Sequence, residues 1–140
     1  ILKKNGTLSI TYNTSGLIGN SYYLKVTSRN ILETWSANPV LMSSSTIYNF
    51  SDNNLKAYQD PFNTNPQQYQ VAPGVWALYS GDVNHDGTID ALDFNQMETD
   101  VNDFQFGYFA TDITGAGPVD ALDFNLLEQN SGYYLFLARP

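Results

Sequence analysis

Cysteine is absent from this 140-residue chain, which excludes disulfide bonds, thiolate zinc sites and a cysteine nucleophile. Charged residues are scarce, at 14% of the sequence against about 25% in an average globular protein. Only six residues are Lys or Arg, and the net charge of -8 argues against nucleic acid binding. No apolar run approaches the roughly 18 residues that a membrane-spanning helix needs.

Common catalytic motifs are also absent. The sequence has no Gly-x-Ser-x-Gly turn, no phosphate-binding glycine loop and no pair of zinc-spaced histidines. The single histidine, His85, falls inside an acidic loop, where we expect an exposed side chain without a catalytic partner. The sequence therefore predicts a protein that is not an enzyme.

Aromatic residues are plentiful, with ten Tyr, eight Phe and two Trp. Together with a hydrophobic content of 42%, they indicate a folded chain with a core. The length suits one ordinary domain or two very small ones. The sequence begins at Ile1 and shows no signal peptide, as expected of a mature chain or of a piece of a longer one.

The charges are distributed unevenly. Residues 1–70 contain three acids and five bases, a net charge of +2, whereas residues 71–140 contain eleven acids and one base, a net charge of -10. Acids at this density repel each other unless something neutralises them. A bound cation is the first candidate, and a role in solubility is the alternative.

The first half alternates apolar and polar residues, which is typical of strands. Asn5-Gly6 has the sequence of a tight hairpin turn, and the Asn- and Pro-rich stretch 51–73 is expected to be a surface loop. Short strands without helical periodicity predict an antiparallel β-sandwich-like domain over residues 1–79. The candidate strands are 1–4, 7–12, 21–28, 31–36, 46–50 and 75–79.

The second half contains an internal repeat with an offset of 30 residues. The sequence Asp-Ala-Leu-Asp-Phe-Asn at residues 90–95 recurs at residues 120–125, and residues 79–82 align with 109–112. Two repeats this close usually form two copies of one supersecondary unit that pack together.

Residues 82–93 of the first copy match the twelve-residue calcium loop of the EF-hand. Side-chain oxygens stand at positions 1, 3, 5, 9 and 12, and Gly87 at position 6 permits the sharp turn. Five oxygens at these positions favour a calcium site over a plain Asx-rich turn. The predicted ligands are Asp82, Asn84, Asp86, the carbonyl of Thr88, Asp90 and Asp93.

The second copy has an incomplete ligand set. Ala116 stands at position 5, where the first loop has Asp86, and Thr114 offers only a hydroxyl. The sequence therefore predicts weaker calcium binding here, and Ala116→Asp should strengthen it. The remaining candidate ligands are Asp112, Thr114, the carbonyl of Pro118, Asp120 and Asp123.

A helix is expected after each loop. Leu92, Phe94 and Met97 recur as Leu122, Phe124 and Leu127, so both helices present an apolar side to a shared core. The Ala-Leu pairs at 91–92 and 121–122 suit packing against the chain itself. Most aromatics of segment 104–109 are also expected in the core. Ile89 at position 8 suits a short strand that joins the two loops.

Two features distinguish these repeats from EF-hands. Position 12 of the first loop carries Asp93 in place of Glu, and a strand, not a helix, precedes the loop. Residues 80–130 thereby resemble a dockerin, in which each loop is followed by one helix. The resemblance implies calcium as cofactor and a protein partner, in that family a cohesin. The expected fold is α+β, with the β-sandwich-like domain followed by a dockerin-like module, 80–140, that ends in a strand-like segment.

Two functions remain open at this point. The first is a non-catalytic, calcium-stabilised adhesion or docking module of a secreted bacterial protein, because extracellular calcium is concentrated enough to fill such loops. The second is a structural subunit of an extracellular filament, in which a terminal strand joins the sheet of a neighbouring copy. A carbohydrate-binding role would depend on Trp35, Trp76 and the tyrosines, which are more often core residues.

Overall fold

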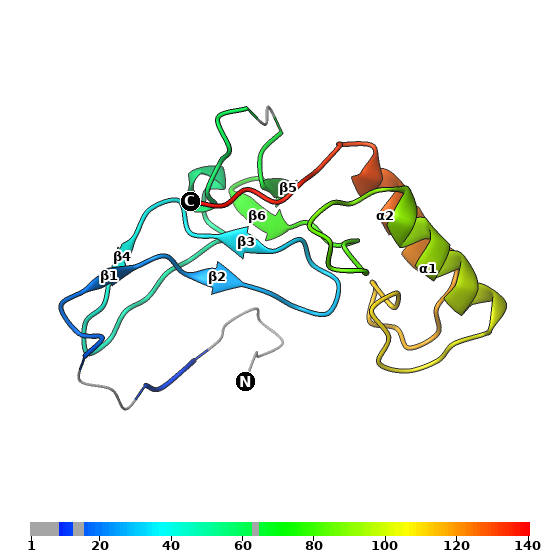
Figure 1. Ribbon diagram of the computed structural model, residues 1–140, viewed down its shortest axis with the longest axis horizontal. Helices are drawn as coiled ribbons and strands as arrows, with labels where there is room; N and C mark the ends of the chain where they lie inside the picture. Colours follow the sequence, from blue (N-terminus) through cyan, green and yellow to red (C-terminus); the bar gives the residue numbers. More distant parts are fainter. Residues whose placement is uncertain (1–8, 13–15, 63–64) are drawn as a thin grey trace.

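The computed structural model describes residues 9–12, 16–62 and 65–140. Within these residues, three two-stranded antiparallel sheets precede two α-helices, so the mixed α+β class is confirmed (Figure 1). The sandwich of two packed sheets is not confirmed. The elements are β1 (Ser21–Tyr22), β2 (Lys25–Val26), β3 (Thr34–Trp35), β4 (Val40–Leu41), the 3-10 helix η1 (Asn54–Lys56), β5 (Gln68–Ala72), β6 (Val75–Leu78), α1 (Ala91–Asn102) and α2 (Ala121–Ser131).

The strands are shorter than the alternation of the sequence indicates. β1 pairs with β4, β2 with β3, and β5 with β6. Segment 46–50 forms no strand, and β5 lies inside the stretch expected to be a loop, so both predictions were wrong. β5 begins Gln-Tyr-Gln and becomes a strand because it pairs with β6 across the turn at Gly74. The Asn5-Gly6 turn lies outside the described residues.

Each helix begins with the same pair of caps. The Asp90 carboxylate accepts a hydrogen bond from the backbone N–H of Leu92 at 2.8 Å, and the Asp93 carboxylate accepts one from the N–H of Asp90 at 2.9 Å. Asp120 and Asp123 form the equivalent capping box at α2. The repeated Asp-Ala-Leu-Asp sequence therefore dictates two identical helix starts, since both caps act within one turn.

The main hydrophobic core lies in the second half. α1 and α2 lie side by side, and the rings of Phe94 and Phe124 meet edge to face with centroids 5.1 Å apart (Figure 1). Met97 and Leu127 are fully buried, as the helical pattern predicted. Leu32 joins this core from the first half, and its other buried members are Tyr79, Ile89, Val119 and Leu135.

Several apolar residues lie outside the core, contrary to the prediction. Leu92 and Leu122 are 56% and 61% exposed, because each stands in the first turn of its helix, before the buried stripe. Of the four aromatic residues in segment 104–109, only Phe109 packs on the core. Phe104, Phe106 and Tyr108 are all more than 70% exposed.

The two loops exchange partners. The N–H of Ile89 donates to the carbonyl of Leu135, which follows α2, and the N–H of Val119 donates to the carbonyl of Gln105, which follows α1. Each loop therefore pairs with the segment behind the other helix, so the prediction that Ile89 joins loop to loop was wrong. Two further bonds repeat the exchange, from Leu137 N to Gly87 O and from Gly107 N to Gly117 O, each 2.7 Å.

The first half meets the second beside the first loop. Leu32 donates its backbone N–H to the carbonyl of Tyr79 at 2.9 Å, and Gly81 donates to the carbonyl of Asn30 at 2.7 Å. Segment 29–32 thereby runs antiparallel to the chain that leads into loop 1. No helix of the described residues has the length and apolar character to cross a membrane.

Candidate calcium-binding site

The first loop, residues 82–93, turns sharply at its sixth position. Gly87 has a φ of +89°, and the equivalent Gly117 of the second loop has a φ of +103°. Residues other than glycine rarely adopt this left-handed backbone conformation. A Cβ at Gly87 would also lie 3.3 Å from the side chain of Leu137. The glycine expected at position 6 of a calcium loop is therefore required in both copies.

Two carboxylates of loop 1 are buried. Asp93 is fully buried, and its Oδ1 accepts hydrogen bonds from the N–H groups of Val83 and Asn84 at 2.8 and 3.2 Å. Asp82 is 2% exposed, and its Oδ1 has no hydrogen-bond partner among the described residues. Burying a carboxylate oxygen without a partner costs free energy, and a bound cation would remove that cost.

The pKa shifts of the loop 1 carboxyl groups are consistent with a cation site. Burial raises the pKa of Asp82, and the neighbouring charge of Asp93 raises it further. Burial also raises the pKa of Asp93, although three backbone N–H donors oppose the change. The pKa of Asp86 is lowered, chiefly by the hydrogen bond from the Thr88 hydroxyl. A divalent cation would favour the ionised forms of all three groups.

The other four predicted ligands of loop 1 contact one another. Asn84 Nδ2 donates to Asp86 Oδ2 at 2.8 Å, and the Thr88 hydroxyl lies 2.6 Å from Asp86 Oδ1. The same hydroxyl lies 3.3 Å from Asp90 Oδ2. The structure thus joins these four residues in one chain of contacts. Across the described ranges, no group of three or more His, Cys, Asp or Glu side chains is arranged to hold a metal.

The donor set of loop 1 fits calcium chemically. Four carboxylates, one amide oxygen and one backbone carbonyl are all hard oxygen ligands, which is what calcium prefers. Asp82 also lines a cavity of about 330 Å³ together with Asp86 and Gly87. His85 is exposed at position 4, where the sequence placed it.

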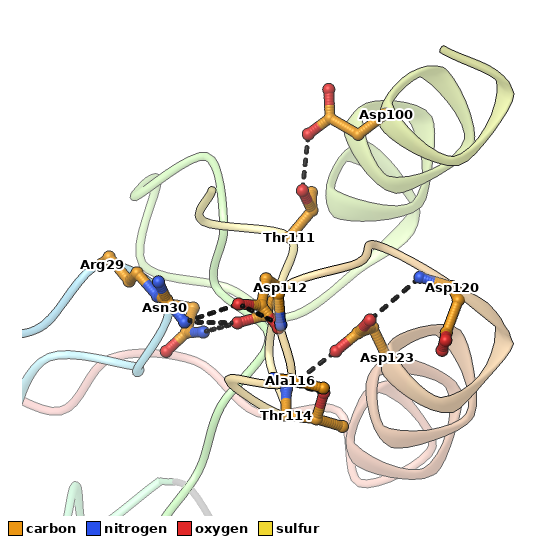
Figure 2. A network of polar contacts seen from close by, with 10 residues as sticks. Arg29, Asn30, Asp100, Thr111, Asp112, Thr114, Ala116, Asp120 and Asp123 are labelled. Atoms are coloured by element: carbon orange, nitrogen blue, oxygen red, sulfur yellow. Dashed lines mark hydrogen bonds and ion pairs between the residues drawn. The ribbon is translucent and has the colours of Figure 1, made fainter. Parts of the chain in front are cut away.

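Loop 2, residues 112–123, repeats the buried part of this arrangement (Figure 2). Asp123 is fully buried and accepts from the N–H groups of Thr114 and Asp120 at 2.7 and 3.0 Å. Asp112 is 2% exposed, and its Oδ1 likewise has no hydrogen-bond partner in the described part of the chain. Thr114, Ala116 and Pro118 are exposed.

Sequence reasoning missed two residues of this site. Nη2 of Arg29 lies 2.7 Å from the carbonyl oxygen of Asp112 and 3.3 Å from its Oδ2. Asn30 Nδ2 donates to the same carbonyl at 3.3 Å (Figure 2). No local pattern could have indicated the contact, because 83 residues separate Arg29 from Asp112. The only hint was the opposite charge of the two halves.

Residues 80–130 match the family model of the dockerin type I domain. Nothing among the curated proteins or the solved structures matches the chain. Dockerin type I domains are non-catalytic, calcium-binding modules that bind cohesin partners. The matched range covers less than half of the 140 residues but includes both loops, α1 and all of α2 except Ser131. It supports a dockerin-like calcium-binding segment at residues 80–130.

Proposed function

We propose that the chain is a non-catalytic, calcium-stabilised docking module. The observation that carries the proposal is the buried, unpartnered Oδ1 of Asp82 inside a loop with calcium spacing. Asp82, Asn84, Asp86, Asp90 and Asp93 would hold the ion through side-chain oxygens and Thr88 through its carbonyl. In loop 2, Asp112, Thr114, Asp120 and Asp123, with the carbonyl of Pro118, would form a weaker site.

Calcium has a structural task in this proposal. When bound, it supplies positive charge to the carboxylates of loop 1, whose acids otherwise repel one another. The contacts between Asn84, Asp86, Thr88 and Asp90 satisfy these groups in its absence. Binding therefore exchanges hydrogen bonds for ligand bonds, and the loop stays attached to α1 through the Asp90–Asp93 cap.

The exposed Ala-Leu pairs supply a surface for a protein partner. Leu92 and Leu122 are exposed at equivalent positions of the two copies, and Ala91 and Ala121 beside them are exposed as well. Exposed apolar residues that recur in two related units are suited to a protein contact. In a dockerin that partner is a cohesin, and the apolar pairs favour an apolar partner surface.

The proposal places the chain outside the cell, in a secreted or cell-surface bacterial protein. Calcium near its extracellular, millimolar concentration would keep such a loop filled. Residues 1–79 and 80–140 would serve as two parts of one unit, joined where segment 29–32 meets the lead-in to loop 1.

Calorimetry with calcium chloride tests the metal site. Wild type should bind calcium more tightly than magnesium, and Asp82→Ala should lose the tight site. Equal affinity for the two ions would contradict the proposal, because a large flexible oxygen shell favours calcium. Docking is tested by capture on immobilised cohesin domains. Leu92→Asp combined with Leu122→Asp should abolish capture while leaving calcium binding intact.

The filament alternative gains no support from the C-terminal segment. Leu137 donates to the carbonyl of Gly87 at 2.7 Å, and Phe136 pairs with Thr88. This segment therefore pairs with loop 1 of its own chain. Electron microscopy with and without chelator tests the alternative, because long calcium-dependent filaments would favour it over a docking monomer.

A further inference from the structure

The guanidinium of Arg29 is held against loop 2 from two sides. Its Nη2 contacts the carbonyl and the carboxylate of Asp112, and its central carbon lies 4.3 Å from the ring centroid of Tyr108. The side chains of Arg29 and Asp112 are 19% and 3% exposed. An ion pair shielded from water to this degree is stronger than one on an open surface.

The two loops differ in where their positive charge can come from. Position 1 of each loop is a buried Asp with an unpartnered Oδ1. Of the ion pairs within the described residues, one joins Arg29 to Asp112 and none involves loop 1. Loop 1 keeps Asp86 at position 5, whereas loop 2 has Ala116 there. The loop that lacks a ligand is thus the loop that has an arginine.

We propose that Arg29 supplies loop 2 with a resident positive charge through the carbonyl and Oδ2 of Asp112, although Oδ1 of Asp112 stays unpartnered. The inference rests on the proposed calcium function and specifies it as one tight calcium site per chain. Arg29 acts by its charge, because a guanidinium beside Asp112 neutralises the carboxylate and repels a divalent ion. The charge of Arg29 does not depend on the calcium concentration, whereas the occupancy of a calcium site does.

The same contact ties the first half to loop 2 without metal. Asn30 donates its side-chain N–H to the carbonyl of Asp112, while its own carbonyl accepts from Gly81 before loop 1. Segment 29–30 therefore contacts both copies of the repeat. Loop 2 would therefore hold the first half at any calcium concentration, and only loop 1 would respond to calcium.

Calorimetry with calcium chloride in an Asp82→Asn background tests the inference, because this background isolates loop 2. Ala116→Asp restores the missing ligand but should not create a tight site while Arg29 is present. Ala116→Asp with Arg29→Gln should bind calcium about tenfold or more tightly than Ala116→Asp alone, the scale of one lost charge-assisted contact. Lys25→Gln, which removes a positive charge paired with Glu33, is the matched control and should have no such effect.

Two results would overturn the inference. One is a tight calcium site in Ala116→Asp in the Asp82→Asn background with Arg29 intact, a result that does not depend on the folding of any Arg29 variant. The other is a gain in affinity when Ala116→Asp is combined with Arg29→Lys, since lysine keeps the charge. Failure of the proposed function would instead appear as absent calcium binding to loop 1 in the parent chain. The loop 2 comparison remains decisive in that case.

Discussion

At the scale of single residues, the acids of loop 1 fall into two groups. Asp82 and Asp93 are buried, and burial raises the pKa of each carboxyl group. Asp86 is exposed, and its hydrogen bond from Thr88 lowers its pKa. Ionisation of the buried pair without a cation therefore costs stability, and this cost grows as the pH rises.

Asp82→Asn should accordingly change stability in opposite directions with and without calcium. In EDTA it should raise the free energy of unfolding by on the order of 1 kcal/mol, because a neutral amide replaces an unpaired buried charge. In saturating calcium it should lower the melting temperature, because calcium affinity falls about a hundredfold with the lost ligand charge. Thermal melts in both buffers measure this, with the exposed Asp52→Asn as control. A stability change of the same sign in EDTA and in calcium would refute the prediction.

Glu33 contacts three side chains, two from the first half and one near the C-terminus. It accepts hydrogen bonds from Lys25, Trp35 and Arg139 at 3.0, 2.8 and 3.2 Å. Burial alone would raise its pKa, but the bonds from Lys25 and Trp35 and the charges of Lys25 and Arg139 outweigh burial. The pKa of Glu33 consequently lies below its ordinary value of 4.5.

The stabilisation from Glu33 should therefore be present above pH 4.5 and disappear as the pH falls through the lowered pKa. Glu33→Gln should cost about 1 kcal/mol or less at neutral pH, since Lys25 and Arg139 are 44% and 63% exposed. The difference in melting temperature from wild type should shrink toward about pH 3. Glu98→Gln, an exposed acid on α1, is the control. A difference that persists unchanged at low pH would argue against the assigned role.

At the scale of elements, the loop ligands also start the helices. Asp120→Ala removes the N-cap of α2 and should cost about 1 kcal/mol, whereas Asp120→Asn should be nearly neutral, because asparagine caps equally well. If Arg29 is the cation of loop 2, the cost should be the same in calcium and in EDTA. Asp90→Ala at α1 should cost more in calcium, because that residue is also a ligand. Paired melts of both alanine variants measure the contrast.

The sequence predicted those features of the elements that depend on near neighbours. The turn at position 6 and the helix start of each copy lie within twelve consecutive residues. The burial of Met97 and Leu127 followed from helical spacing and the repeat. These predictions succeeded because the physical causes act within one loop or one turn.

Features that depend on distant pairing could not be predicted in the same way. β5 is polar at Gln68 and Gln70, and it forms against β6. The exchanged pairing of the loops needs both copies folded, because Ile89 bonds to Leu135 and not to Val119. The Arg29–Asp112 pair and the exposure of Leu92 depend equally on how whole segments are placed.

At the scale of the molecule, the two copies and the first half support each other. The Thr111 hydroxyl, just before loop 2, donates to Asp100 of α1, while Asn130 of α2 donates to the carbonyl of Ser80, just before loop 1. Each helix thus holds the lead-in to the other copy's loop. The first half contributes Leu32 to the core, and Gln67 donates to the carbonyl of Phe136 at 3.1 Å.

These contacts predict that calcium stabilises both halves together. Both tryptophans, Trp35 and Trp76, lie in the first half, whereas α1 and α2 lie in the second. Tryptophan fluorescence therefore reports on one half and the circular dichroism of the helices on the other. Calcium at about 100 times its dissociation constant should raise both melting midpoints by roughly 5–10 °C.

Asp82→Asn should abolish the calcium-dependent shifts of both melting midpoints, which would show that the shifts arise from calcium binding to loop 1. A calcium shift in circular dichroism without one in fluorescence would mean that residues 1–79 fold as an independent domain. The observed pairing argues for a common shift, because Leu32 and Asn30 bond directly to Tyr79 and Gly81, the last residues before the first ligand. If the Arg29 anchor on Asp112 is also required, Arg29→Gln should separate the two midpoints while leaving calcium binding to loop 1 in place.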